Sequence, residues 1–326
     1  MSKPKVFITR RIPEAGLNLI MLECDVDLWD KDLPPTKEEL LKHVPGVNGI
    51  LSLLSDPIDA DVIHAAGDNL KVISNYAVGF NNIDVRTATQ LGIAVGNTPG
   101  VLTEATADFA FALMMSAGRR VVEAEKHVRA GQWKTWGPST LLGVDFAGAT
   151  LGIIGFGRIG KAMARRATGF GMRILIYDPT AKPMTGVIKV DLETLYRESD
   201  FISLHIPLTP ETRHLINADA FSKMKPNAVL VNTARGEIID QTVLYDALKS
   251  HKIFAAGIDV SEPEPLPMDS PLFELENLII CPHIASASTS TRENMALIAA
   301  RNLLAGLQGH RLPHVVNPEI YQKDHL

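Results

Sequence analysis

Gly155, Gly157 and Gly160, spaced as G-x-G-x-x-G, are the residues that most clearly could do chemistry. They follow an apolar run at 151–154 and precede a helix-like segment at 161–169. In such a context the first glycine permits a tight turn, the second lets the backbone approach a pyrophosphate, and the third lets helix and strand pack closely. The helix N-terminus then attracts the phosphates, and Arg158 can add a charge-assisted contact. The pattern favours a dinucleotide site over an ordinary turn.

An acidic residue at the end of the next strand refines this prediction. Asp178 stands 18 residues after Gly160 and closes the run 173–177. An acid at about this spacing usually accepts hydrogen bonds from the adenosine ribose hydroxyls, and its charge would repel a 2′-phosphate. No Arg or Lys follows before Lys182. We therefore expect NAD(H) to be preferred over NADP(H).

Three later strand ends carry groups suited to carbonyl reduction, which needs a cation to hold the substrate and a group that exchanges a proton. Arg235 follows the run 228–232, Glu264 lies beyond the run 255–260, and His283 follows the run 278–281. Parallel sheets bind ligands at this edge, and imidazole titrates near neutral pH. Taken singly, each has an ordinary alternative: a surface arginine, a loop acid or a structural histidine. Glu262, in the same Pro-rich turn, competes with Glu264 for the acidic role.

These groups need two α/β frameworks to position them. Strand-like runs alternate with helical patterns in both halves of the chain, which predicts parallel, doubly wound sheets. A capping box, Thr36 with Glu39, starts one helix. A small-residue-rich stretch at 103–130 predicts one long helix, and 131–148 reads as an irregular surface excursion. The expected strands are 5–9, 26–29, 49–54, 71–75 and 93–95, then 149–154, 173–177, 201–206, 228–232, 255–260 and 278–281.

Composition narrows the class of protein. The chain has 326 residues, enough for two domains, and is 46% hydrophobic and 21% charged, as in ordinary globular proteins. The net charge of −5 offers no basic stripe for nucleic acid, and no apolar run reaches the length of a membrane span. Two cysteines cannot form a disulfide framework, so we expect a cytoplasmic protein that binds neither nucleic acid nor membrane.

Seven segments together resemble the D-2-hydroxyacid dehydrogenase family, and more narrowly its glyoxylate/hydroxypyruvate reductases. They occur in family order over nearly the whole chain: 75–79 (NYAVG), 103–108 (TEATAD), 155–160 (GFGRIG), 205–208 (HIPL), 232–236 (NTARG), 259–265 (DVSEPEP) and 282–285 (PHIA). The resemblance implies a central Rossmann NAD-binding domain at 100–289. It also implies a discontinuous, flavodoxin-like substrate domain made of 1–99 and 290–326.

The resemblance also implies roles for single residues. Arg235 would grip the carboxylate and carbonyl of the substrate, His283 would donate the proton, and Glu264, which like the family's acid directly precedes a proline, would support His283. The backbone N–H groups of Val78 and Gly79 would hold the substrate carboxylate, and Leu54 would wall the pocket. The implied cofactor contacts are Thr106, Gly155, Gly157, Arg158, Ile159, Gly160, Asp178, His205, Pro207, Thr212, Thr233, Ala234, Asp259, His283 and Ala285.

These expectations define an NAD-dependent reductase of small 2-oxoacids, which forms glycolate from glyoxylate and D-glycerate from hydroxypyruvate. No ligand spacing typical of a metal site is present, and we expect none. The same three catalytic groups also suit a phosphite or another D-2-hydroxyacid dehydrogenase, and a non-enzymatic NAD-sensing corepressor can retain them. By analogy with the family we expect a homodimer that uses the stretch 103–130 and the excursion with Trp133 and Trp136.

Overall fold

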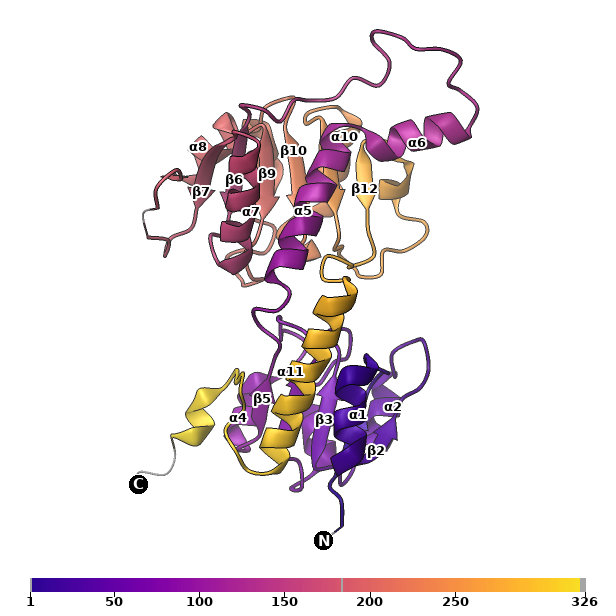
Figure 1. The fold of residues 1–326 in the computed structure, drawn as a ribbon, viewed down its shortest axis with the longest axis vertical. Coiled ribbons are helices and arrows are strands. Elements are labelled where there is room, and N and C mark those ends of the chain that lie inside the picture. The colour runs from indigo at the N-terminus through magenta and orange to yellow at the C-terminus, as the bar shows by residue number, and fades with distance from the viewer. Residues whose placement is uncertain (1, 183, 323–326) are drawn as a thin grey trace. The chain divides into compact units, whose positions relative to one another are not determined.

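The computed structural model describes residues 2–182 and 184–322. The chain divides into two compact units: Met1–Leu102 with Ala287–Leu326, and Thr103–Ser286. Each unit is an α/β structure with its own parallel sheet, so the predicted fold class is confirmed (Figure 1).

In the part of the first unit that the structure describes, five strands pair in parallel in the order β2-β1-β3-β4-β5. This is the flavodoxin-like order, whose switch point lies between β1 and β3. The strands are β1 (Lys5–Ile8), β2 (Asp25–Leu28), β3 (Gly49–Ser52), β4 (Val72–Asn75) and β5 (Ala94–Gly96).

Helices cover both faces of this sheet, which explains why its inner strands β1, β3 and β4 are almost wholly buried. Val6 and Ile8 pack with α1 (Glu14–Glu23) and α11 (Thr289–Leu307), while Phe7 between them faces the opposite layer. The opposite layer contains α2 (Lys37–His43), α3 (Ala60–Ala66) and α4 (Val85–Gln90).

The last long helix belongs to the first unit because it packs closely on α1. A Cβ placed on Gly16 of α1 would lie 2.4 Å from the carbonyl oxygen of Ala296 in α11. Only glycine permits this approach. After α11, Val315 forms a bridge with Gly96 of β5, and a short 3-10 turn follows at Pro318–Tyr321.

The described residues of the second unit form a seven-stranded parallel sheet in the order β12-β11-β10-β9-β6-β7-β8. This is the Rossmann order with one strand added. The strands are β6 (Thr150–Ile154), β7 (Arg173–Tyr177), β8 (Ile188–Lys189), β9 (Phe201–Leu204), β10 (Val229–Asn232), β11 (Ala255–Ile258) and β12 (Leu278–Ile280).

Two apolar clusters lie on opposite faces of this sheet. Ile153 packs with α5 and α7, whereas the next residue, Ile154, packs with α8, α9 and α10. Since successive strand side chains point to opposite faces, continuous apolar strands are what such a sheet requires. The helices are α5 (Thr103–Gly118), α6 (Val121–Arg129), α7 (Arg158–Gly169), α8 (Leu192–Glu198), α9 (Ala218–Lys223) and α10 (Gln241–Lys249), with 3-10 turns at Gly236–Ile238 and Pro271–Glu274.

One predicted helix is wrong in detail. The stretch 103–130 is two helices, α5 and α6, because Arg120 adopts a left-handed backbone conformation with φ of 54°. The Arg120 guanidinium pairs with Glu123 in the first turn of α6, at 2.5 and 2.8 Å. The strand β8 was not predicted, and the strands predicted at 49–54, 201–206 and 255–260 end two residues earlier than expected. The capping box at Thr36 and Glu39 is confirmed.

Within residues 2–182 and 184–322, no helix combines the length and apolarity that crossing a membrane requires.

Candidate active site

The glycine-rich turn joins β6 to α7, and its three glycines are needed for different reasons. A Cβ on Gly155, whose φ is +93°, would lie 2.4 Å from the carbonyl oxygen of His205, and one on Gly160 would lie 2.1 Å from the carbonyl oxygen of Gly155. The protein itself therefore demands glycine at both positions. A Cβ on Gly157 would meet no described atom within 4 Å. Gly157 begins α7 without a side-chain cap, so the turn offers open space and helix N–H groups, as a pyrophosphate needs.

Asp178 lies directly after β7 and next to this turn. Its carboxylate accepts hydrogen bonds from the N–H groups of Phe156 at 2.8 Å, Thr180 at 2.8 Å and Ala181 at 3.1 Å. Burial alone would raise the pKa of Asp178, but these hydrogen bonds lower it below its ordinary value. An ionised carboxylate therefore stands beside the glycine turn.

His283 and Glu264 form a hydrogen-bonded pair. The Nδ1 atom of His283 lies 2.6 Å from Oε1 of Glu264, and the side chains are 23% and 35% exposed. Burial would raise the pKa of Glu264, but the hydrogen bond and charge of His283 lower it, with help from the N–H of Ser261 and the charge of Arg235. The pair thus keeps Glu264 ionised and leaves Nε2 of His283 available for other partners.

The turn that carries His283 is held by Asp259. The Asp259 carboxylate accepts hydrogen bonds from the N–H groups of Ile284 and Ala285 at 2.8 and 2.7 Å. The N–H of His283 donates to the Asp259 carbonyl at 2.9 Å, and His283 has a φ of 55°. Burial raises the pKa of Asp259, against the effect of these N–H groups. The neighbouring Cys281 thiol is partly buried, and burial raises its pKa too.

Arg235 is placed by a buried asparagine that sequence analysis missed. Asn232, the last residue of β10, accepts from the N–H of Ala234 at 2.9 Å and donates to the carbonyl of Arg235 at 2.7 Å. A Cβ on Gly236 would lie 2.1 Å from Ser261, so glycine lets the Arg235 turn pack against the Glu264 loop. Burial lowers the pKa of Arg235, and the charge of Glu264 opposes this; a guanidinium nevertheless stays charged.

The two competing glutamates have different partners. Glu262 binds the guanidinium of Arg213 at 2.7 Å and Nε2 of His214 at 2.8 Å, whereas Glu264 contacts His283. This geometry favours Glu264 as the partner of the histidine. The proline that directly follows Glu264 does not distinguish it, because Glu262 also directly precedes a proline, Pro263.

Most other predicted cofactor residues lie along the C-terminal edge of the same sheet. Thr212 donates to the carbonyl of Pro207 at 2.7 Å and so shapes the loop after β9. The ring of His205 contacts the Ser203 hydroxyl at 2.9 Å, and burial lowers the pKa of His205 to about 4. In the described part of the chain, the buried Thr233 hydroxyl has no hydrogen-bond partner. Thr106 is buried in the first turn of α5, and Arg158 and Ile159 begin α7.

The predicted substrate residues of the first unit follow β3 and β4. Leu54 is 37% exposed. The carbonyls of Val78 and Gly79 accept from the side chains of Asn97 and Asn75 at 2.7 and 2.8 Å. Among the described residues no protein acceptor is found for the N–H groups of Val78 and Gly79.

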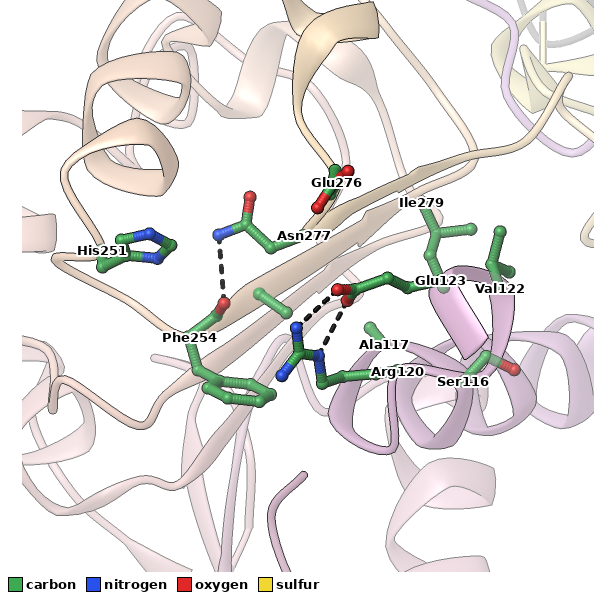
Figure 2. A pocket seen from close by; sticks show the side chains of 11 residues that line it. Ser116, Ala117, Arg120, Val122, Glu123, His251, Phe254, Glu276, Asn277 and Ile279 are labelled. Carbon is green, nitrogen blue, oxygen red and sulfur yellow. Dashed lines mark hydrogen bonds and ion pairs between the residues drawn. The ribbon is translucent and has the colours of Figure 1, made fainter. Parts of the chain in front are cut away.

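A hollow in the second unit is a different feature (Figure 2). It is lined by the Arg120–Glu123 ion pair, Phe254 and Asn277. Phe254 directly precedes β11, and Asn277 directly precedes β12. The hollow is therefore at the edge of the sheet opposite to Arg235 and His283. Over the residues that the structure describes, no group of three or more His, Cys, Asp or Glu side chains gathers as a metal site would require.

The fold and these strand-end groups define a dinucleotide-binding enzyme, and comparison with known proteins identifies its family. Residues 111–285 match the family described as the D-isomer specific 2-hydroxyacid dehydrogenase, NAD binding domain. The chain belongs to this family, as the resemblance predicted.

Relatives match over nearly the whole chain. A glyoxylate reductase of Korarchaeum cryptofilum is 53% identical over 323 residues, which cover 98% of this chain and 97% of that protein. The TT0316 protein of Thermus thermophilus has a solved structure with a TM-score of 0.91 and 47% identity, covering 96% of this chain and 99% of that one. An NADPH-dependent glyoxylate/hydroxypyruvate reductase of Sinorhizobium meliloti has a TM-score of 0.83 and 29% identity, covering 96% of this chain and 98% of that one.

Proposed function

We propose that this protein reduces glyoxylate to glycolate and hydroxypyruvate to D-glycerate, with NADH as the cofactor. The observation that carries the proposal is the His283–Glu264 pair beside Arg235, in a chain that is about half identical to a glyoxylate reductase over its full length. A proton donor, its ionised partner and a fixed cation are the groups that reduction of a 2-oxoacid requires.

In this proposal His283 donates the proton to the carbonyl oxygen of the substrate and takes it back in the reverse reaction. Glu264 accepts the hydrogen bond of Nδ1 and therefore fixes the ring orientation, with Nε2 directed to the substrate. The negative charge of Glu264 stabilises the protonated ring before transfer. Asp259 holds the turn on which the ring is mounted.

The substrate carboxylate is assigned to two kinds of donor. Arg235 presents a planar, charged fork that suits the carboxylate and the adjacent carbonyl. The N–H groups of Val78 and Gly79 complete the set, which agrees with their lack of acceptors among the described residues. Leu54, exposed after β3, forms an apolar wall that suits a short side chain.

The residues around the glycine turn fit a dinucleotide. The open space at Gly157 and the uncapped start of α7 suit the pyrophosphate, with Arg158 and Ile159 at its first turn. Thr233, whose hydroxyl lacks a described partner, is assigned with Asp259, Ala234, His283 and Ala285 to the nicotinamide side. Thr106 is assigned to the phosphates, and His205, Pro207 and Thr212 are assigned to the adenine side. When bound, NADH supplies the hydride for the keto carbon.

The preference for NADH over NADPH rests on Asp178. Its lowered pKa keeps it ionised, and a carboxylate favours ribose hydroxyls over a 2′-phosphate. The S. meliloti relative is described as NADPH-dependent, so the preference for NADH does not follow from the family and is a proposal for this protein.

Absorbance of NADH at steady state tests the whole proposal. We expect turnover with glyoxylate and hydroxypyruvate, weaker turnover with pyruvate and 3-phosphohydroxypyruvate, and a lower kcat/KM with NADPH. Phosphite with NAD is the control for the phosphite dehydrogenase alternative. Tight NADH binding without turnover of any substrate would reject the proposal that the protein is an enzyme and would favour a non-enzymatic NAD sensor. Faster turnover with NADPH than with NADH would reject only the proposed role of Asp178 in cofactor preference, and the proposed reaction would stand.

We further propose a cytoplasmic homodimer that contacts no nucleic acid. The net charge of −5 and the two unpaired cysteines support the location and the lack of nucleic-acid binding. The exposed apolar residues of α6 and of the segment after it support the dimer.

A further inference from the structure

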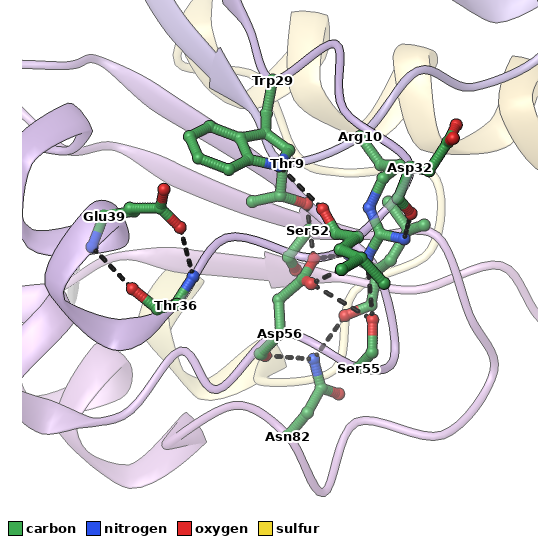
Figure 3. A network of polar contacts seen from close by, with 12 residues as sticks. Thr9, Arg10, Trp29, Asp32, Thr36, Glu39, Ser52, Ser55, Asp56 and Asn82 are labelled. Atoms are coloured by element: carbon green, nitrogen blue, oxygen red, sulfur yellow. Dashed lines mark hydrogen bonds and ion pairs between the residues drawn. The ribbon is translucent and has the colours of Figure 1, made fainter. Parts of the chain in front are cut away.

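A buried carboxylate occupies the switch point of the five-stranded sheet (Figure 3). In flavodoxin-like sheets the ligand crevice opens between β1 and β3, where the strand order reverses. Here Thr9 follows β1 and Asp56 lies four residues after β3, and the Asp56 side chain is wholly buried. The protein therefore fills this crevice with its own acidic group.

Donors from several segments surround this carboxylate. Asp56 accepts from the Thr9 hydroxyl at 2.5 Å, the Leu53 N–H at 2.7 Å and the Ser55 hydroxyl at 3.2 Å. The guanidinium of Arg10 lies 3.5 Å away. Because a buried carboxylate requires such partners, these contacts tie Asp56 to Thr9 and to residues 53–55.

Asn82 connects this loop to the next one. Its side-chain nitrogen donates to the carbonyls of Leu53 at 2.9 Å and Asp56 at 3.1 Å. Its side-chain oxygen accepts from Asn75 at 3.1 Å, and the same Asn75 nitrogen donates to the carbonyl of Gly79 at 2.8 Å. Since two carbonyl oxygens require a donor, the orientation of the Asn82 amide is determined by its partners.

We infer that Asn82 is a positioning residue for the 2-oxoacid, which couples the Leu53–Leu54 loop to the Val78–Gly79 turn through Asn75. The inference rests on the proposed function. Without the Asn82 amide, the Asp56 carbonyl loses its donor, the Leu53 carbonyl keeps only the Asp56 N–H at 3.1 Å, and the amide that holds Gly79 loses an acceptor. Asp56 anchors the network at the switch point. A substrate carboxylate held by N–H groups of this turn therefore depends on a side chain that need not touch it.

The test compares Asn82→Ala with Asn317→Ala in the full-length protein. Asn317 is buried in the same unit and makes three side-chain hydrogen bonds, to Val95, Thr89 and Ile93, which lie in and before β5 rather than in the two loops. We expect Asn82→Ala to raise the KM for glyoxylate about tenfold, as loss of an organising hydrogen bond predicts, with the KM for NADH unchanged. Asn317→Ala should lower Tm at least as much and leave the KM for glyoxylate at the wild-type value.

Equal KM values for glyoxylate in the two variants would show that Asn82 is only structural and would overturn the inference. If Asn82→Ala does not fold, the pair Thr9→Val and Thr9→Ser decides. Thr9→Val, which keeps the shape and removes one donor to Asp56, should raise the KM for glyoxylate several-fold, and Thr9→Ser should restore it. An unchanged KM in Thr9→Val rejects the network. Lack of any 2-oxoacid reduction by the wild-type protein would instead mark failure of the proposed function itself.

Discussion

His283 and Arg235 have separate tasks in the proposed reaction, and kinetics can separate them. His283→Ala removes the proton donor, so we expect kcat with glyoxylate to fall by about 10²–10⁴, the usual contribution of a general acid. Arg235→Ala removes the grip on the carboxylate and should chiefly raise KM. Steady-state kinetics with saturating NADH measures both. Near-normal turnover of His283→Ala would exclude it as the proton donor.

Glu264 and Glu262 stand two residues apart and provide a matched pair. Glu264→Gln removes the negative charge that lies beside His283, so we expect kcat to fall at least about tenfold. Glu262→Gln loosens contacts with Arg213 and His214 and should lower Tm while kcat stays within about threefold of wild type. Activity and thermal melts of the two variants decide the assignment. A larger loss of kcat in Glu262→Gln would reverse it.

His205 makes stability depend on pH in a predictable direction. Its pKa is lowered to about 4 in the folded protein, against about 6.5 in an unfolded chain, because folding takes much of the ring out of contact with water. Between these values the unfolded chain binds a proton that the folded chain does not. This contribution to stability is therefore fully present above pH 6.5 and is lost as the pH falls toward 4. Calorimetry at about pH 7 and about pH 5 should show a smaller loss of Tm for His205→Gln than for wild type. Equal losses would contradict the prediction.

The glycine turn is the element where one substitution acts on binding and another on folding. Gly157→Ala puts a Cβ where no described atom lies within 4 Å, at a φ of −73°, so the protein should fold normally. The same Cβ enters the space assigned to the pyrophosphate, and we expect NADH to bind at least about tenfold more weakly. Fluorescence titration with NADH measures this.

Gly160→Ala is the control within the same turn. Its Cβ would lie 2.1 Å from the carbonyl oxygen of Gly155, so it should lower Tm by several degrees or prevent folding. Unchanged NADH affinity in a folded Gly157→Ala would mean that the dinucleotide does not approach this glycine.

Local signals explain which elements could be predicted from the sequence. The sequence predicts the start of helix α2 because its capping box, Thr36 with Glu39, lies within four consecutive residues. The sequence does not predict the break before α6, because no local pattern marks Arg120 as a residue with a left-handed backbone conformation. The strand β8 has only two residues, too few for an alternating pattern.

The candidate site was predictable for a related reason. Arg235 and His283 follow apolar strands, so the sequence marks them as strand-end groups. Asn232 holds Arg235 through polar contacts within the turn that directly follows β10, which no apolar pattern marks. Asp259 holds the His283 turn through N–H groups 25 and 26 residues away. Asn82 depends on contacts with residues 26 and 29 positions away. Such partners are set by tertiary structure, and a single sequence carries no pattern that reveals them.

At the scale of the whole molecule, the unit that begins the chain is completed by its end. Helix α11 packs on α1 through Gly16, and the buried Asn317 fills the edge at β5 with three hydrogen bonds. The second unit is continuous from Thr103 to Ser286 and contains the residues matched by the NAD-binding family. Sequence could suggest this order because the glycine motif lies in the middle of the chain, but the close contact at Gly16 is visible only in the structure.

Exposed apolar side chains around α6 support a dimer. Helix α6 has no buried residue and exposes Val121 and Val128, and the segment after it exposes Trp133 by 61%, Trp136 by 79% and Leu142 by 60%. Large apolar groups gathered on one segment of a monomer usually mark an interaction site. We expect sedimentation equilibrium to give twice the 35.5 kDa of one chain.

A double substitution tests whether this segment forms the contact. Trp133→Ser with Trp136→Ser should shift the protein to the mass of one chain, because it removes two aromatic side chains that an interface would bury. Leu22→Ser with Leu33→Ser is the matched control, since these leucines of the first unit are 72% and 77% exposed. The control should keep the mass of the wild type. A dimer that survives loss of both tryptophans and dissociates in the leucine control would place the contact on the first unit instead.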